Sequence, residues 1–144
     1  MLGILCSIIA GAAMSVQGVM NTRLGEHIGT MEANSLVQCT AAVLSLLALL
    51  VYHTGSFAAL GETPKLYWLG GILGLVITVT VMLGIKNLSP TVAISVILVS
   101  QLLVAAVIDA FGLMESEKVA FGWTKWAGLA LMIGGVVLFK FKQS

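Results

Sequence analysis

Short polar turns divide this sequence into five long apolar segments, a pattern that few folds accommodate. A helix needs about 20 apolar residues to cross a hydrocarbon core of about 30 Å. Segments of that kind cover residues 2–22, 33–52, 66–85, 91–111 and 123–139. We therefore predict an all-α membrane protein with five transmembrane helices, which form a single transmembrane domain over residues 1–144.

The scarcity of charged residues excludes the other structural classes. Only 9% of the residues are Asp, Glu, Lys or Arg, whereas 59% are apolar. Soluble domains contain about 25% charged residues and must wet most of their surface, and disordered chains need low hydrophobicity and high charge. The net charge of +1 gives no basic face for nucleic acid. The lipid bilayer is the first partner that we expect.

Capping residues indicate where several helices begin and end. Thr63-Pro64 and Ser89-Pro90 each combine an N-cap residue with a proline suited to the first helical turn, which predicts that the third and fourth helices begin there. Gly29 is predicted to end the first helix in the left-handed conformation, and Gly112 is predicted to close the fourth helix. The loops are short, so we expect consecutive helices to be antiparallel neighbours.

Positive charges are almost evenly divided between the two sides of the membrane. Five helices place Lys65, Lys118 and Lys125 on one side and Arg23, Lys86, Lys140 and Lys142 on the other, three against four. An excess of Lys and Arg normally fixes the cytoplasmic side. This balance favours insertion in both orientations and an antiparallel homodimer, although the two lysines of the tail also allow a single orientation. No Lys or Arg precedes Arg23, so residues 1–22 are expected to be a retained helix rather than a signal peptide.

Polar side chains within the apolar segments are the candidate substrate-binding groups, because such groups usually face a cavity or the protein interior. The candidates are Gln17, Asn21, Asn34, Gln38, Ser95, Gln101 and Asp109. The first four form two pairs spaced by four residues, which places each pair on one helix face. A hydrogen bond between helices explains any single amide equally well. The whole set favours a shared polar cavity, with Gln101 near its centre.

The sequence offers little for other chemistry. No charged residue lies near the centre of a segment, and Asp109 is the best candidate for a proton-coupling acid, although solvation at the membrane interface explains its position better. Cys6 and Cys39 lie in apolar runs and are predicted to be buried small hydrophobes rather than a disulfide or a metal site. His27 and His53 lie outside the segments. We expect no cofactor, no metal and no enzymatic activity, and a small substrate held by amide and hydroxyl groups.

Small residues recur at helical spacing in three segments, which lets helices approach closely in lipid. They are Gly3, Ser7, Gly11 and Ser15 in the first segment, Gly70, Gly74 and Thr78 in the third, and Gly128, Gly134 and Gly135 in the fifth. Packing within one chain is the default explanation for all three groups. Residues 127–138 carry no polar side chain and suit neither a pore nor a pocket. We therefore select Gly128, Gly134 and Gly135 as the predicted dimer interface.

The same residues also form the pattern of a known family. The first helix carries it as Gly11, Gln17, Asn21, Leu24 and Gly29, the third as the glycines of residues 69–74, the fourth as Ser100-Gln101, Asp109 and Phe111-Gly112, and the last as Gly128 with Gly134-Gly135-Val136. Over essentially its whole length the chain resembles the YdcZ-like five-helix family of the bacterial drug/metabolite transporter superfamily. Ser100 stands where that family often has Gly, which concerns local packing.

The resemblance implies a multi-pass protein of the bacterial inner membrane that exports a small molecule as an antiparallel pair, either a homodimer or two paralogues. We accordingly predict a secondary transporter subunit that works by alternating access around a site at the membrane midplane. A small dual-topology channel and a non-transporting accessory or scaffold protein are the alternatives. Four-span multidrug relatives carry a glutamate in their first helix. Residues 2–22 contain no acid, so that proton-exchange mechanism is not carried over.

Overall fold

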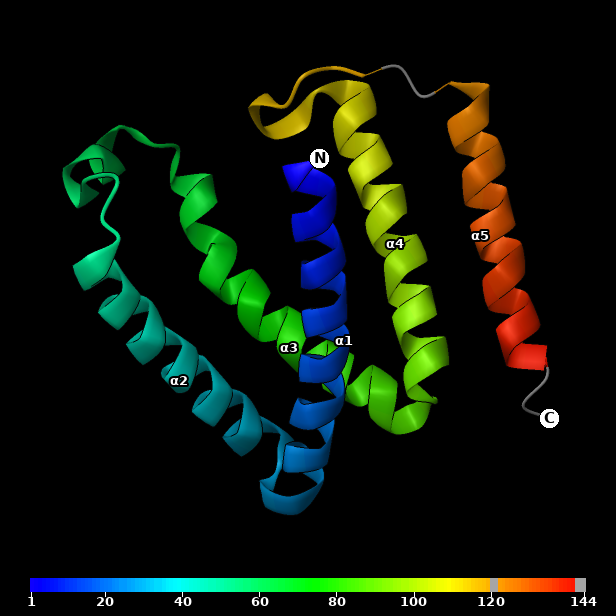
Figure 1. The fold of residues 1–144 in the computed structure, drawn as a ribbon, viewed down its shortest axis with the longest axis horizontal. Coiled ribbons are helices and arrows are strands. Elements are labelled where there is room, and N and C mark those ends of the chain that lie inside the picture. Colours follow the sequence, from blue (N-terminus) through cyan, green and yellow to red (C-terminus); the bar gives the residue numbers. More distant parts are fainter. Residues whose placement is uncertain (120–121, 142–144) are drawn as a thin grey trace. The chain divides into compact units, whose positions relative to one another are not determined.

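The computed structural model describes residues 1–119 and 122–141, and every regular element in those ranges is helical (Figure 1). The α-helices are α1 (Leu2–Ile28), α2 (Thr30–Val51), α3 (Gly70–Asn87), α4 (Pro90–Phe111) and α5 (Trp123–Phe141). Short 3₁₀ helices lie in the connections, namely η1 (Phe57–Glu62), η2 (Lys65–Leu69) and η3 (Leu113–Glu115). The predicted all-α fold is thus confirmed for the part of the chain that is described.

Four helical segments are long and apolar enough to cross a membrane. They are Leu2–Ile28, Thr30–Val51, Lys65–Asn87 and Pro90–Phe111. The third of these segments consists of η2 followed by α3. The fifth apolar helix, Trp123–Phe139, is shorter, in agreement with the sequence. In each of the four, only 6% to 11% of the most apolar stretch is buried inside the protein. So large an apolar surface requires lipid or a partner to cover it.

The chain separates into two compact units, Met1–Lys86 and a second unit that begins at Asn87. In the first unit α1 packs against α2, and side chains near the end of α3 contact α1. In the second unit α4 packs against α5, and η3 packs against α4. Figure 1 shows that the two helices of each pair run in opposite senses, as the short loops predicted.

Two glycines of α1 allow α3 to cross it at close range. A Cβ atom at Gly18 would lie 3.0 Å from Ile85 Cδ1, and one at Gly25 would lie 2.5 Å from Met82 Cε. Met82 and Ile85 are buried, and together with the fully buried Ala33 they form the apolar core of the first unit. Positions seven residues apart share a face of a helix, so Gly18 and Gly25 form a strip of α1 without side chains on which α3 packs closely.

The small-residue repeat predicted to pack the first helix is not used inside this unit. No other segment comes within 4 Å of a Cβ built at Gly3 or Gly11. The hydroxyls of Ser7 and Ser15 donate to the carbonyl oxygens of those glycines, at 2.8 and 3.0 Å. The close contacts are made by Gly18 and Gly25 instead, because α3 meets α1 near its C-terminal end.

The prediction that Cys6 and Cys39 are buried is wrong, since both are free thiols on exposed parts of their helices. An apolar neighbourhood predicts burial in a soluble protein, where apolar side chains leave water. In a membrane protein an apolar neighbourhood is equally suited to lipid. The two cysteines lie on α1 and α2, outside the small core at which α1, α2 and α3 meet.

Gly29 is the single residue between α1 and α2, and its backbone makes the sharp reversal possible. Its φ of 103° is positive, as expected, but its ψ of 147° lies outside the left-handed helical region that the sequence predicted. The backbone conformation that Gly29 adopts is open almost only to glycine. The Gly29 N–H still donates to the carbonyl of Gly25 at 3.0 Å, and its own carbonyl accepts from the N–H of Ala33 at 3.0 Å.

The two proline-containing start signals lead to different structures. Ser89 caps α4 as predicted, because its hydroxyl accepts from the N–H of Val92 at 3.4 Å, and Gly112 ends α4 in the left-handed conformation. Thr63 does not cap α3. Its hydroxyl donates to the Leu60 carbonyl at 2.8 Å and accepts from the Trp68 indole at 3.2 Å. The chain therefore forms η2 before α3 begins at Gly70.

Candidate functional site

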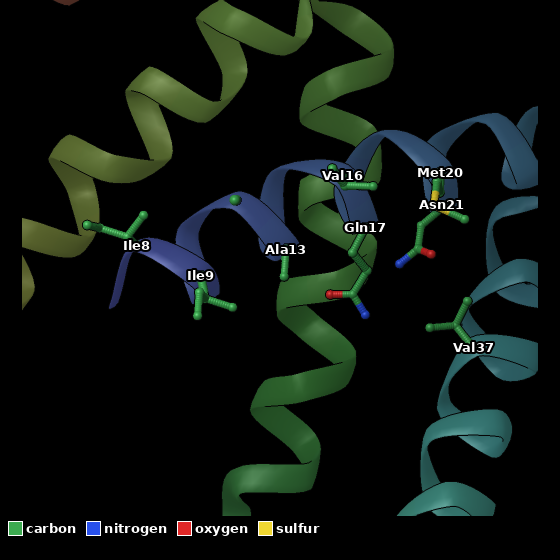
Figure 2. Close-up of a pocket in the computed structure, with 9 residues that line it drawn as sticks. Ile8, Ile9, Ala13, Val16, Gln17, Met20, Asn21 and Val37 are labelled. Carbon is green, nitrogen blue, oxygen red and sulfur yellow. The ribbon is translucent and has the colours of Figure 1, made fainter. Parts of the chain in front are cut away.

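A groove of about 640 Å³ runs along one face of α1. It is lined by Ile8, Ile9, Ala12, Ala13, Val16, Gln17, Met20 and Asn21 of α1 and by Val37 of α2 (Figure 2). The α1 positions repeat at intervals of four in two adjacent rows, which traces one stripe on a helix. Figure 1 shows α2 diverging from α1 with distance from their connecting turn, so the stripe is left open. Grooves of this volume accommodate small molecules.

The groove is apolar along most of its length and polar at one end. Its two amide side chains, Gln17 and Asn21, are one turn apart and both face the groove on the side where Val37 of α2 lies (Figure 2). Asn21 is only 7% exposed, whereas Gln17 is exposed. The two amides therefore share one face, as their spacing predicted.

Asn34 of α2 is the most deeply buried of the predicted polar residues. It is 4% exposed, and its side-chain oxygen Oδ1 has no hydrogen-bond partner among the described residues. A buried acceptor without a partner costs about 1–3 kcal/mol. Asn34 precedes Val37 by three residues, which places it about one helical turn nearer to the Gly29 connection. Asn34 does not itself line the groove, and its unused acceptor lies buried on the same helix as Val37.

Gln38, the other amide predicted on α2, lies next to α3. Its Nε2 atom is 3.6 Å from the position that a Cβ of Gly74 would occupy, which is an ordinary van der Waals distance. Gln38 itself is half-buried. The predicted pair Asn34 and Gln38 therefore lies on the inner side of α2, and the role of both in substrate binding stays a prediction.

No residue that lines the groove carries a titratable side chain. The nearest charged residues along α1 are Arg23 and Glu26, which form an ion pair with an N–O distance of 2.9 Å. The Arg23 side chain is 73% exposed and points to the surface rather than to the core. The groove consequently offers amide groups and hydrocarbon, with no fixed charge.

The sequence of this chain also matches the model of a known protein family. Residues 2–138 match the family described as "Putative inner membrane exporter, YdcZ". The chain belongs to the YdcZ family. The resemblance seen in the sequence is thus confirmed, and the protein is a multi-pass protein of the inner membrane. Neither the comparison with curated proteins nor that with solved structures found a match.

In this YdcZ-family chain, three predicted substrate-binding residues lie on α4, in the second unit. The hydroxyl of Ser95 donates to the carbonyl of Thr91 at 2.7 Å, within its own helix. Gln101, near the middle of α4, is exposed, and Asp109 in its last turn is half-buried. The backbone carbonyl of Asp109 accepts from the N–H of Val119 at 2.9 Å. Substrate binding by these residues stays a prediction.

The glycines predicted to form the dimer interface are open within the second unit. No other segment lies within 4 Å of a Cβ built at Gly128, Gly134 or Gly135. Among residues 123–139 of α5, Leu129 is the buried one, with 4% of its surface exposed. Packing inside the unit therefore leaves the three glycines free for another helix, and the dimer interface stays a prediction.

The apolar part of the groove was not predicted from the sequence. The glycines of α1 that pack against α3 in the first unit were not predicted either. The repeat of Ile9 and Ala13 at intervals of four continues into Gln17 and Asn21, and this signal is present in the sequence. Contacts of Gly18 and Gly25 with α3 depend on helices that are far apart in sequence. Within residues 1–119 and 122–141, no three His, Cys, Asp or Glu side chains come together as metal ligands would.

Proposed function

We propose that this protein is the subunit of a small-molecule exporter that works by alternating access. The observation that supports the proposal most directly is the polar end of the α1 groove, where Gln17 and Asn21 face an otherwise apolar groove. The buried oxygen of Asn34, on the α2 helix that contributes Val37 to the groove, is unpaired. In lipid such groups are costly unless a cargo or water satisfies them. A structural helix bundle has no need for an unpaired buried acceptor, whereas a transporter can use one.

A pair of oppositely inserted copies is the assembly that we propose. Three Lys on one side against four Lys or Arg on the other set the orientation only weakly, and transporters are often built from inverted halves around a midplane site. The exposed amide of Gln101 near the middle of α4 needs a polar neighbour outside its own unit. In a symmetric antiparallel dimer the two end states have equal energy, so a gradient must bias transport.

Two measurements test the exporter proposal. The first is accessibility of single cysteines placed at each terminus, in a Cys6→Ser/Cys39→Ser background, to an impermeant reagent in intact cells. Labelling of each terminus from both sides supports insertion in both orientations. Labelling from one side only contradicts the homodimer and favours a paralogue as partner.

The second measurement is flux of small molecules into proteoliposomes. Saturable flux that Gln101→Leu or Gln17→Leu reduces at least tenfold supports the transporter with these side chains at its site. Fast flux without saturation would make the protein a channel. A preparation that binds and moves no solute would make it an accessory protein. The matched control is Thr40→Val on α2, because the Thr40 hydroxyl is exposed and bonded to the carbonyl of Leu36 in its own helix.

A further inference from the structure

The chemistry of the α1 groove restricts the class of molecule that it can hold. We infer that the cargo is an uncharged amphipathic molecule whose apolar body lies along α1 and whose polar head donates a hydrogen bond to Asn34. This inference deepens the proposed function, on which it rests. It depends on three features of the first unit, which are the order of residues along the groove, the absence of charge and the unpaired Asn34 oxygen.

The order of residues in the groove suits a molecule with two chemically different ends. From Ile8 to Val16 the α1 stripe offers only aliphatic side chains, and the amides of Gln17 and Asn21 follow. Burial of hydrocarbon along the aliphatic part contributes about 25 cal/mol per Å². A fully polar solute gains nothing there, and a fully apolar solute leaves the amides unsatisfied. An amphipathic molecule matches both parts.

The absence of charge selects against ions. A charged group loses several kcal/mol of hydration when it enters an apolar site, and only an opposite charge or a dense set of hydrogen bonds compensates for this loss. None of the lining residues carries charge. Arg23 and Glu26, one turn beyond Asn21, neutralise each other. Neither a cationic nor an anionic head therefore has a counter-charge in the groove.

The unpaired oxygen of Asn34 selects a hydrogen-bond donor. A side-chain carbonyl oxygen only accepts, so its complement on the cargo is a hydroxyl or an uncharged N–H. In this structure protein atoms enclose Oδ1, and a donor reaches it when α2 moves away from α1. Gly29, the single linking residue, has the glycine backbone on which such a movement can pivot. Binding of a donor would then favour the parted arrangement of the two helices.

Four matched probes test this inference on the full-length protein in nanodiscs. They are 4-phenylbutanol, 4-phenylbutyl methyl ether, 4-phenylbutylammonium and 4-phenylbutyrate, which share one apolar body and differ in the head group. Equilibrium dialysis against protein-free nanodiscs corrects for partition into lipid. We expect the alcohol to bind about tenfold more tightly than the ether, as for one net hydrogen bond to a buried acceptor, and both ions to bind more weakly than the alcohol.

The variant Asn34→Leu distinguishes the contribution of the Asn34 acceptor to binding from the contribution of the apolar groove. It should weaken binding of the alcohol to the level of the ether and leave binding of the ether unchanged. Thermal unfolding should show that the variant is at least as stable as the wild type, because leucine has a similar shape and removes an unsatisfied acceptor. Thr40→Val, on the same helix, should change neither affinity. If Asn34→Leu does not fold, the smaller Asn34→Ala takes its place in the same comparison of the alcohol with the ether.

The outcomes distinguish this inference from the proposed function. Equal affinities for the alcohol and the ether, tighter binding of either ion, or an unchanged alcohol affinity in Asn34→Leu would overturn the inference. Flux of a charged compound that depends on Gln17 would overturn it too, and the exporter would stand. Binding of the alcohol that depends on Asn34, without flux of any solute, would support the inference and contradict the exporter.

Discussion

Gly18 and Gly11 lie on the same helix but meet different surroundings. A Cβ at Gly18 would lie 3.0 Å from Ile85 Cδ1 and 3.2 Å from Val81 Cγ1, whereas a Cβ at Gly11 would meet nothing within 4 Å. Glycine weakens a helix by about 0.5–1 kcal/mol relative to alanine. The cost at Gly18 is offset by the close packing of α3, and inside the first unit no such contact offsets the cost at Gly11.

Leucine substitutions at these two glycines should therefore have opposite effects on stability. Gly18→Leu should lower the free energy of unfolding by about 1–3 kcal/mol, because overpacking displaces α3. Gly11→Leu should raise it by up to about 1 kcal/mol through helix propensity. Thermal unfolding of the purified variants in detergent checks both. Equal shifts for the two variants would contradict the packing of α3 against Gly18.

Gly29 should be sensitive even to alanine. Its φ of 103° is a conformation that residues with a Cβ atom rarely adopt, whereas the Glu32 carboxylate beside its Cβ position can rotate away. We expect Gly29→Ala to cost about 1–3 kcal/mol. Gly55→Ala serves as the control, since nothing lies within 4 Å of its Cβ position, and should change stability by less than about 0.5 kcal/mol. A neutral Gly29→Ala variant would show that α1 and α2 are joined differently.

At the scale of elements, α3 and α4 show how one start signal depends on its neighbours. Both follow a residue with a hydroxyl and a proline. The Ser89 hydroxyl accepts from an N–H of α4 and caps it. The Thr63 hydroxyl is occupied by the Leu60 carbonyl and the Trp68 indole. Proline favours a helix start in both cases, but the Thr63 hydroxyl accepts from the Trp68 indole rather than from a backbone N–H of a following first turn.

Removal of the α4 cap gives a direct test. Ser89→Ala should destabilise the protein by about 1 kcal/mol, because one N–H in the first turn of α4 loses its partner. Ser89→Asp should restore most of the stability, since a carboxylate also accepts at that position and favours a helix N-terminus. Thermal unfolding is the measurement. A fully stable Ser89→Ala variant, or an Asp variant no better than Ala, would contradict the capping role.

At the scale of the whole molecule, the even distribution of charge makes orientation adjustable. Lys65→Gln/Lys118→Gln leaves one lysine against four positive residues, whereas Lys86→Gln/Lys140→Gln/Lys142→Gln leaves three lysines against Arg23 alone. By the positive-inside rule each of these variants should insert in one orientation, and the two orientations should be opposite. Labelling of terminal cysteines in intact cells would verify both orientations.

The two fixed-orientation variants also test the proposed antiparallel pair. Each expressed alone should give less than a tenth of the wild-type flux, because oppositely inserted copies are absent. Co-expression of both should restore most of it. Full flux from either variant alone would show that antiparallel pairing is unnecessary. No recovery on co-expression of two well-inserted variants would contradict the pairing as well.

The amino-acid sequence alone determined the membrane class, the apolar helices, the Ser89 and Gly112 boundaries and the pairing of Gln17 with Asn21 on one face. Each of these follows from hydropathy or from the 3.6-residue helical repeat, which act over neighbouring residues. Tertiary structure decided that Gly18 and Gly25, rather than Gly3 and Gly11, meet α3, and that Asn34 is buried without a partner. Those outcomes depend on which distant helices come together, and in a membrane protein an apolar face suits lipid as well as another helix.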